Sequence, residues 1–319
     1  MAIIVVIGSL NMDLVALAPR LPLAGETLTG TRYLTVPGGK GANQAYAAAR
    51  LGGDVAMLGR IGTDDHGKQM LANLADAGCD VSGVGRVEGA SGVAVIVVAE
   101  SGANQIVVVP GANHAYLAAD VVRDRPRLAG ARFALLQLEI PLEAVIEAAR
   151  AAGDAGAQVI LDPAPAPSSL PRELLELVDV LTPNETEAAL LVGEASLGES
   201  AGREPRRSAG ALSVDDARDI ATRLRSMGAK AVIIKLGAQG CLLVEDGAST
   251  TVPAPQVNTV DTTAAGDVFN AAFAVACSEG ASYLDACRFA VRAAALSVTR
   301  LGAQSSMPTR AELNAFGER

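Results

Sequence analysis

The sequence predicts an α/β protein with a mainly parallel sheet, helices on both faces of that sheet, and a small additional β lid. From residue 132 onward, short apolar runs alternate with helical patterns, which is the rhythm of βαβ units. Earlier in the chain, residues 14–36 and 92–110 are rich in β-branched residues and interrupted by Pro or Gly, as in a separate small sheet. We therefore expect one domain over residues 1–319, in which these two segments cover a site or form a dimer surface.

The composition limits the partners that the chain can have. Half of its 319 residues are hydrophobic, only 3% are aromatic, and the net charge is −9. Nucleic-acid binding depends on Lys and Arg that neutralise phosphates, so we expect no nucleic-acid partner. No apolar run reaches the ~18 residues of a membrane span, and the first ten residues, without a basic lead-in, favour a first strand over a signal peptide. These features predict a cytoplasmic protein without a membrane partner.

Cysteine and histidine usage narrows the chemistry. The four cysteines are Cys79, Cys241, Cys277 and Cys287. They lack C-x-x-C spacing, which predicts neither a disulfide framework nor a zinc site. With only two histidines, His66 and His114, a His-based triad or a multi-His metal site has little to work with. Acid–base chemistry therefore falls to a carboxylate.

Several predicted strands are followed directly by polar side chains. The strands are Ile3–Ile7, Phe133–Leu138, Val159–Leu161 and Val178–Leu181. The polar residues that follow them are, in order, Asn11 with Asp13, Glu139, Asp162, and Asn184 with Glu187. Because open α/β sheets bind ligands at the carboxyl ends of their strands, we expect these residues to converge on one site. Each alone also fits a turn residue or a helix-start acid.

Two glycine-rich segments add to this picture. The segment Gly38–Asn43 opens a helix predicted over Gln44–Leu51, and its glycines let the backbone approach a ligand closely. Lys40 supplies a cation there, but no Ser or Thr follows it, so the segment is not a Walker A loop. A second segment, Gly237–Gly240, follows the predicted strand Ala231–Lys235 and suits either a nucleotide base or a plain hairpin.

One other segment imitates a phosphate-binding loop. Residues Gly62–Gln69 match the first part of the P-loop pattern but end in Gln, which removes the hydroxyl that binds magnesium. We interpret this segment as a loop and a helix start. Residues Leu197–Leu212 are polar and rich in Gly, Ser and Arg, which predicts a mobile surface loop of unassigned role. A helix is expected from Val214, capped by Ser213.

The segment Asp261–Asn270 combines the features of a phosphoryl-transfer site. It runs from a turn into a predicted helix, and the small residues Ala264, Ala265 and Gly266 would expose backbone N–H groups at the helix N-terminus. Asp267 follows them, where a carboxylate can take a proton from an attacking hydroxyl while the N–H groups stabilise the transferring phosphate. At a helix N-terminus this carboxylate is expected to stay ionised. The alternative is a capped helix start with an ordinary acidic residue.

These blocks, in this order, resemble the ribokinases of the PfkB-type sugar kinase family. The resemblance covers nearly the whole chain and rests on Gly8–Asp13, Gly38–Asn43, Gln137–Glu139, Asp162–Ala166, Thr182–Glu187 and Asp261–Asp267. It implies ATP-dependent phosphorylation of D-ribose on its 5-hydroxyl, with Mg²⁺ and K⁺, in a homodimer joined through the β lid. The chain departs from the family in the length of the 197–212 loop and in Val291, where a polar contact to ATP is common.

The resemblance also implies residue roles. Asp267 matches the catalytic base, and Ala264, Ala265 and Gly266 match the anion hole. The sugar would be held by Asn11, Asp13, Gly39, Lys40, Asn43 and Glu139. ATP would contact Asn184, Lys235, Leu236, Gly237, Ala238, Gln239, Gly240 and Gly266. Glu187 matches an acid linked to magnesium. A potassium site would use Asp261, Thr263, Ser297, Arg300, Gly302 and Ser306.

Other functions remain open at this stage. The same chemistry could act on deoxyribose, a fructose-type sugar or adenosine, although Asn11 and Asp13 favour a sugar with vicinal hydroxyls and the low aromatic content disfavours a nucleoside. A catalytically silent sugar sensor is a second alternative, which the intact Gly266–Asp267 pair and Lys40 disfavour. A Rossmann oxidoreductase is a third, but no G-x-G-x-x-G follows the first strand.

Overall fold

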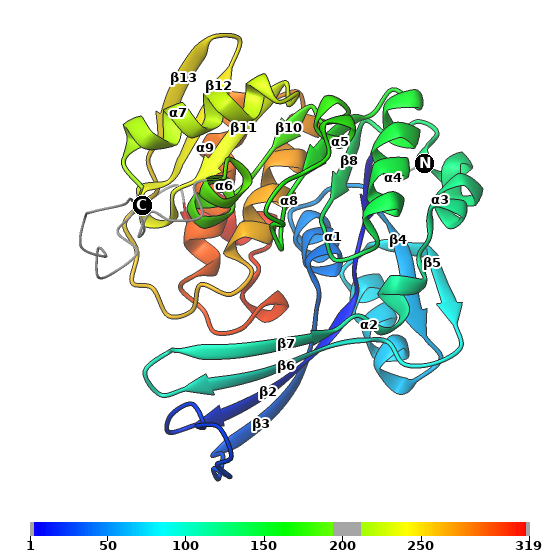
Figure 1. Ribbon diagram of the computed structural model, residues 1–319, viewed down its shortest axis with the longest axis vertical. Helices are drawn as coiled ribbons and strands as arrows, with labels where there is room; N and C mark the ends of the chain where they lie inside the picture. Colours follow the sequence, from blue (N-terminus) through cyan, green and yellow to red (C-terminus); the bar gives the residue numbers. More distant parts are fainter. Residues whose placement is uncertain (1–2, 194–211, 317–319) are drawn as a thin grey trace.

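The computed structural model describes residues 3–193 and 212–316. Its main element is a nine-stranded sheet with the strand order β13-β12-β11-β10-β9-β8-β1-β4-β5 (Figure 1). These strands are β1 (Ile4–Ile7), β4 (Val55–Gly62), β5 (Asp80–Val87), β8 (Phe133–Leu136), β9 (Gln158–Leu161), β10 (Val180–Leu181), β11 (Ala231–Lys235), β12 (Cys241–Glu245) and β13 (Ala248–Val252). The pairs from β11 to β5 are parallel, whereas β12 and β13 are antiparallel. The predicted mainly parallel sheet is confirmed.

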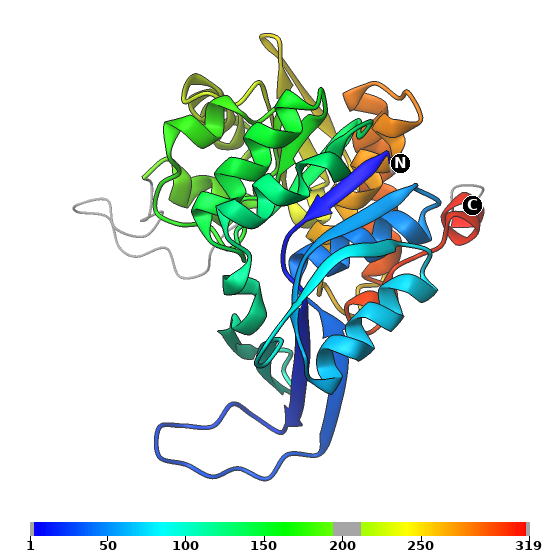
Figure 2. The ribbon, with the colours of Figure 1, turned by 90° about the vertical axis from the view of Figure 1, so that its right-hand side faces the viewer.

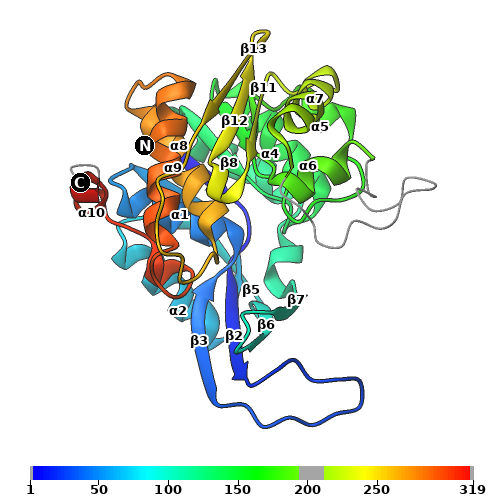
Figure 3. The same ribbon diagram turned by 90° about the vertical axis from the view of Figure 1, so that its left-hand side faces the viewer.

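Two layers of helices cover the faces of this sheet (Figures 1 and 3). The first layer consists of α1 (Lys40–Arg50), α2 (Asp65–Asp76), α8 (Ala265–Ser278), α9 (Tyr283–Ser297) and α10 (Arg310–Phe316). The second consists of α3 (Ala118–Asp124), α4 (Leu142–Asp154), α5 (Arg172–Glu176), α6 (Glu185–Leu191) and α7 (Val214–Ser226). Short 3₁₀ turns are η1 (Gly111–Ala115), η2 (Arg125–Leu128), η3 (Gly237–Gln239) and η4 (Gln304–Ser306).

Strand β1 shows why the central strands are continuously apolar. Successive side chains of a strand point to opposite faces, so a sheet covered on both sides needs an apolar residue at every position. Ile4 and Val6 pack into the core shared with the first helix layer, whereas Val5 and Ile7 pack into the core of the second. All four are fully buried.

Strands β4 and β5 are not predicted by the apolar pattern, because glycines interrupt both. The structure gives a reason for these glycines. A Cβ atom at Gly59 would lie 2.7 Å from the carbonyl oxygen of Gly8, and one at Gly85 would lie 2.8 Å from the guanidinium of Arg60. Close packing at this edge of the sheet therefore removes the residues by which a strand is usually recognised.

A second sheet extends away from the α/β body, with the strand order β3-β2-β6-β7 (Figures 2 and 3). Its strands are β2 (Asn11–Ala18), β3 (Arg32–Gly38), β6 (Gly92–Ala99) and β7 (Asn104–Val109). They come from the two segments in which the sequence predicts extended chain. β7 is exposed along its whole length, including Ile106 and Val107, which are 53% and 63% exposed. This sheet therefore presents an apolar edge to solvent.

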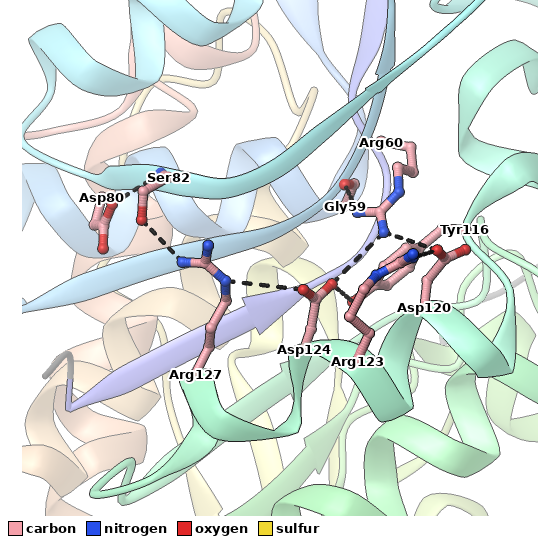
Figure 4. A network of polar contacts seen from close by, with 9 residues as sticks. All are labelled: Gly59, Arg60, Asp80, Ser82, Tyr116, Asp120, Arg123, Asp124 and Arg127. Carbon is pink, nitrogen blue, oxygen red and sulfur yellow. Dashed lines mark hydrogen bonds and ion pairs between the residues drawn. The ribbon is translucent and has the colours of Figure 1, made fainter.

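A polar network around Arg60 ties the main sheet to the segment that follows β7 (Figure 4). Its guanidinium lies 4.6 Å from the ring centre of Tyr116, 3.0 Å from Asp120 and 3.7 Å from Asp124. The Arg60 side chain is only 8% exposed, and its ion pairs with Asp120 and Asp124 offset the free-energy cost of burying its charge. The network holds α3, and with it the preceding turn η1, against β4.

The remaining expectations about the fold have mixed outcomes. Ser213 caps α7 as predicted, and all four cysteines are free and buried. The helix after the first glycine segment begins at Lys40, four residues earlier than expected. Apart from Leu212, the predicted 197–212 loop lies outside the described residues. In the described ranges, none of the helices has the length and apolarity needed to cross a bilayer.

Candidate active site

A cavity of about 600 Å³ lies at the carboxyl ends of β9, β10 and β11. Its polar lining includes Lys40, Asp162, Asn184, Glu187, Lys235 and Asp267. Its apolar lining includes Val257, Val291, Ala294, Ala295 and Val298. The N-terminus of α8, Ala264–Gly266, also borders the cavity. Three of the polar residues expected after the strands, Asp162, Asn184 and Glu187, therefore line this cavity, whereas Asn11, Asp13 and Glu139 do not belong to its lining.

Asp267 lies in the first turn of α8 and is buried. Its two carboxylate oxygens accept hydrogen bonds from the amides of Asn43 (3.0 Å) and Gln44 (3.1 Å). Burial raises the pKa of Asp267 to about 6, and the charge of Lys40 and these two hydrogen bonds oppose that rise. The helix position predicted an ionised acid, and with a pKa of about 6 the carboxylate is mostly ionised at pH 7. A pKa this close to neutrality suits a general base.

Lys40 is the first residue of α1, and its charge acts on Asp267. Burial opposes its charged form, but Asp267, Asp162, Glu139 and Glu187 together outweigh that effect and raise its pKa. Lys40 therefore stays protonated at any physiological pH. It provides a fixed positive charge between the strand-end carboxylates.

Close backbone packing brings α1 to this position. Gly39 has a φ of +88°, and a Cβ atom there would lie 2.6 Å from the backbone nitrogen of Asn11. A Cβ atom on Gly41 would lie 2.6 Å from the backbone nitrogen of Ser9. The glycines thus allow the start of α1 to lie directly against the chain between β1 and β2. The functional side chains of both segments consequently face the same space.

Glu139 organises the neighbouring polar group. One of its carboxylate oxygens accepts hydrogen bonds from the Ser9 hydroxyl (2.5 Å), the Lys40 backbone N–H (3.1 Å) and the Asn11 amide (3.4 Å). Asp13 lies nearby on β2, where burial and the charges of Glu139 and Asp267 raise its pKa to about 7. Among the residues predicted to hold the sugar, Asn11 and Lys40 contact Glu139, Asn43 contacts Asp267, and the charges of both carboxylates act on Asp13.

Asn113, on η1, was not predicted as a site residue. Its side chain accepts a hydrogen bond from the backbone N–H of Leu10 (2.9 Å) and donates to the Leu10 carbonyl (3.1 Å) and to the Asn11 side-chain oxygen (2.8 Å). These contacts orient the Asn11 amide so that its NH₂ group points toward Glu139. The Arg60 network holds Tyr116 and α3 directly after the turn that carries Asn113, and Asn113 joins this turn to Asn11 at the start of β2.

Lys235 and Asp162 form an ion pair in the cavity wall. Their charged atoms are 2.9 Å apart, and the Lys235 side chain is 13% exposed. A Cβ atom on Gly266 would lie 3.3 Å from the Lys235 ammonium, so this cation approaches the start of α8. The Ala265 amide donates to the Thr262 carbonyl (3.2 Å), whereas Gly266 lies in the helix turn whose amides have no intrahelical partner. An anion at this point would meet both Lys235 and a helix N-terminus.

The predicted nucleotide contacts are only partly brought together. Gly237, Ala238 and Gly240 border the cavity, but Leu236 is buried and Gln239 is exposed, and neither belongs to its lining. The β11–β12 turn serves as a hairpin and as a cavity wall at once. Asn184 and Glu187 cap α6, because each side chain bonds to the backbone N–H of the other (2.8 Å in both cases). Glu187 therefore has a structural role besides its place in the cavity.

The residues predicted to bind potassium lie on two adjacent segments. The carboxylate of Asp261 accepts hydrogen bonds from Thr263 (2.6 and 2.9 Å) and from the backbone N–H of Gly302 (2.8 Å). Burial opposes its ionisation, but these hydrogen bonds outweigh it and lower the pKa of Asp261. The Ser297 and Ser306 hydroxyls donate to carbonyls of their own segments, and Arg300 pairs with Glu312 (2.9 Å).

A buried carboxylate of raised pKa, a helix N-terminus beside it and a cavity lined by Lys are features that suit phosphoryl transfer to a hydroxyl. Residues 1–310 match the model of the pfkB family carbohydrate kinases. The chain therefore belongs to the pfkB family of carbohydrate kinases.

Individual relatives agree with this assignment. The chain is 43% identical over 315 residues to a ribokinase of Haemophilus influenzae, covering 98% of this chain and 97% of that protein. The structure of a ribokinase from Thermotoga maritima matches with a TM-score of 0.87 at 39% identity, and both chains are fully covered. Arabidopsis thaliana ribokinase, solved with ribose and ATP, matches with a TM-score of 0.85 at 36% identity over 99% of this chain and 98% of that one.

Replacing Gly39 by Ala tests the close approach of α1 to β2. We expect Gly39→Ala to lower the free energy of unfolding by more than about 3 kcal/mol, because it combines left-handed backbone strain with a steric clash. Gly52 is the matched control, since its φ is +87° but no atom lies within 4 Å of an added Cβ. Gly52→Ala should cost only about 1 kcal/mol. Urea unfolding measures both, and equal losses would contradict the packing argument.

Proposed function

We propose that this protein transfers the γ-phosphate of ATP to the 5-hydroxyl of D-ribose. The observation that carries this proposal is the position of Asp267, which contacts the predicted sugar ligand Asn43 and also borders the cavity suited to a nucleotide. The relatives named ribokinase, one of them solved with ribose and ATP, support ribose as the acceptor. Asn11, Asp13 and Glu139 supply polar groups for ring hydroxyls, and a sugar lacking such a hydroxyl would leave them unpaired.

In the proposed reaction, Asp267 takes the proton of the sugar 5-hydroxyl as its oxygen attacks the γ-phosphorus. The bond from that phosphorus to the bridging oxygen of ADP breaks, and the negative charge passes to ADP. The Asn43 and Gln44 amides orient the carboxylate toward the incoming hydroxyl. Lys40, Lys235 and the N-terminus of α8 lie where they can stabilise the charge on the transferring phosphoryl group.

Cations fit two parts of the site. Four carboxylates surround Lys40, and Glu187 among them borders the cavity, which favours an ATP that arrives with Mg²⁺. Mg²⁺, when bound, would neutralise phosphate charge. The ionised Asp261 and the neighbouring backbone of residues 297–306 have the oxygen chemistry that K⁺ requires. Asp261 would hold K⁺ there and keep the segment before α8 in place.

The second sheet has two proposed roles, as a lid over the sugar and as a dimer contact. Asn11 and Asp13 lie on β2, so one end of this sheet belongs to the sugar subsite. The exposed apolar residues Ile106 to Val109 on β7 resemble an interface more than an ordinary solvent-exposed strand. Closure would exclude water, which otherwise competes as phosphate acceptor.

Turnover with a panel of acceptors tests the proposed reaction. We expect ATP consumption with D-ribose to exceed that with 2-deoxyribose, fructose or adenosine, and K⁺ to increase it. Asp267→Asn should reduce kcat by at least about 10³-fold, since the base is lost while the volume is kept. Preferred turnover of another acceptor would reassign the substrate. Sugar binding by calorimetry without any turnover would instead identify a sensor.

The pH dependence of kcat/KM tests the two raised pKa values. Both carboxylates must be ionised, Asp267 to accept a proton and Asp13 to accept a sugar hydroxyl. We therefore expect kcat/KM to fall as the pH drops below about 7 and to steepen toward two protons below about 6. The Asp13→Asn variant should bind the sugar more weakly, and its kcat/KM should fall with the uptake of a single proton near pH 6. A wild-type kcat/KM that falls only near pH 4 would contradict the assignment of raised pKa values to Asp267 and Asp13.

A charged substitution on β7 tests the proposed dimer. Ile106→Asp should convert the wild-type dimer to a monomer, because it places a charge in the apolar contact. Val122→Asp is the control, since Val122 is equally exposed, at 53%, but lies on α3. Sedimentation equilibrium separates the outcomes. A monomeric wild type, or an Ile106→Asp variant that remains dimeric, would refute the proposed interface.

A further inference from the structure

Two series of side-chain amides end on the Asp267 carboxylate, one on each oxygen. The first begins at Asn73 on α2, whose NH₂ group donates to the side-chain oxygen of Gln304. The Gln304 NH₂ group donates to the Asn43 oxygen (3.1 Å), and the Asn43 NH₂ group donates to Asp267 Oδ2 (3.0 Å). Every amide in this series therefore points in the same direction, with its donor end toward the base.

The second series approaches from the opposite side. The Gln137 NH₂ group donates to the Gln44 oxygen (2.7 Å), and the Gln44 NH₂ group donates to Asp267 Oδ1 (3.1 Å). The same Gln44 nitrogen also donates to Asp162 Oδ2 (3.1 Å), and the other oxygen of Asp162 is paired with Lys235. Gln44 therefore connects the base to the ion pair in the cavity wall.

We propose that Gln44 and Gln304 are positioning residues, which hold Asp267 in its ionised form and in its working orientation through these two amide series. The inference rests on the proposed role of Asp267 as the base. It goes beyond that role by assigning a function to two glutamines that are buried and lie more than 30 residues from Asp267 in sequence. Neither needs to touch the substrate to act in this way.

The direction of the amides is fixed by their partners. Gln44 cannot turn its oxygen toward Asp267, because the reversed amide would place that oxygen against two carboxylates, Asp267 and Asp162. The Gln304 oxygen is likewise held by Asn73. Aligned amides polarise one another, and their effect on a charge is strongest where water is excluded. Each series therefore favours the ionised form of the base.

Amides suit this position better than cations. Asp267 is surrounded by the charges of Lys40, Asp162, Asp13 and, through Asp162, Lys235. A second ammonium in contact with the carboxylate would stabilise the ionised form further and reduce its proton affinity below what a base requires. Neutral donors offset part of the cost of burial and leave the pKa close to neutrality.

Gln304 also carries this effect beyond the cavity. It lies on η4, between Gly302, which donates to Asp261, and Ser306. A shift of residues 302–306 would move the Gln304 NH₂ group that donates to the Asn43 oxygen. The geometry of residues 302–306 is therefore coupled to the base through one hydrogen-bonded side chain.

Near-isosteric substitutions of the two glutamines test the proposal. Gln44→Met removes the hydrogen-bond donor to Asp267, whereas the ion pair between Asp162 and Lys235 is retained. We expect the acid limb of kcat to rise by about one pH unit, because a hydrogen bond to a charged group is lost. The ionised fraction at pH 6 should then fall from about one half to about one tenth, so the rate should fall about fivefold at that pH and recover toward the wild-type value above pH 8. The KM for sugar should change by less than about threefold.

The two changes at Gln304 distinguish polarity from packing. Gln304→Met removes the donor to Asn43 and should raise the limb by about half a unit. Gln304→Glu keeps the shape but presents an oxygen, which would turn the Asn43 amide and direct its oxygen at Asp267, so a larger shift is expected. Gln69→Glu, at an exposed site on α2, is the matched control for the added charge and should leave the limb unchanged.

A direct titration separates this proposal from the proposed reaction. The ¹³C shift of the Asp267 carboxyl, assigned by its loss in Asp267→Asn, reports its pKa in the absence of turnover. A raised pKa of Asp267 in the folded Gln44→Met and Gln304→Glu variants, together with an unchanged pKa in Gln69→Glu, would support the positioning role even if ribose is not the acceptor. Unchanged values in folded variants would overturn it. Should Gln44→Met fail to fold by circular dichroism, the two Gln304 variants decide the result.

Discussion

The burial of Asp267 is the constraint on which the site depends. For its proposed role as a base, a carboxylate taken out of water must keep its charge at neutral pH and still have enough proton affinity. Neutral amides from Asn43 and Gln44 supply its hydrogen bonds, while Lys40 contributes through its charge. This balance requires the start of α1 to meet the start of α8 at close range. The glycines of the 38–41 segment make that meeting possible.

The path of the chain follows from the same requirement. The turn after β1 carries Ser9 and Asn11 past the N-terminus of α1, and the backbones approach too closely for any side chain at Gly39. Asn113 then fixes Leu10 and Asn11 from the other side. On the other side of α1, Asn43 and Gln44 contact Asp267 across more than 200 positions of the sequence. Their order in the sequence reflects the topology of the sheet and not their closeness in space.

The sequence was informative where one local rule decides the structure. Apolar runs predicted most strands of the parallel sheet, and polar residues after them predicted where the site would lie. The rule failed at β4 and β5, where close packing selects glycine and removes the apolar pattern. The α8 position of Asp267 was predictable, but its raised pKa was not. That shift is caused by burial, which depends on the packing of distant segments.

Gln44 and Gln304 show a different limit of sequence reasoning. A glutamine one residue after Asn43 fits an ordinary helix position, and nothing nearby in the sequence identifies its partners. Gln44 meets Asp267 across 223 positions, and Gln304 meets Asn43 across 261. Only the folded arrangement shows that their amides share a direction. The pattern that matters here is the orientation of dipoles in space, for which the sequence carries no period or spacing.

The charge balance of the site explains how an acidic chain can use an anionic nucleotide. The net charge is −9, and four carboxylates act on Lys40 inside the site. Lys235 is already paired with Asp162, so part of its charge is neutralised before any ligand arrives. The negative carboxylates would therefore repel a bare triphosphate, whereas a triphosphate accompanied by a cation would be repelled less. In the proposed reaction, the carboxylates that disfavour a free nucleotide would favour its cation complex, and they raise the pKa of Lys40 so that it stays protonated.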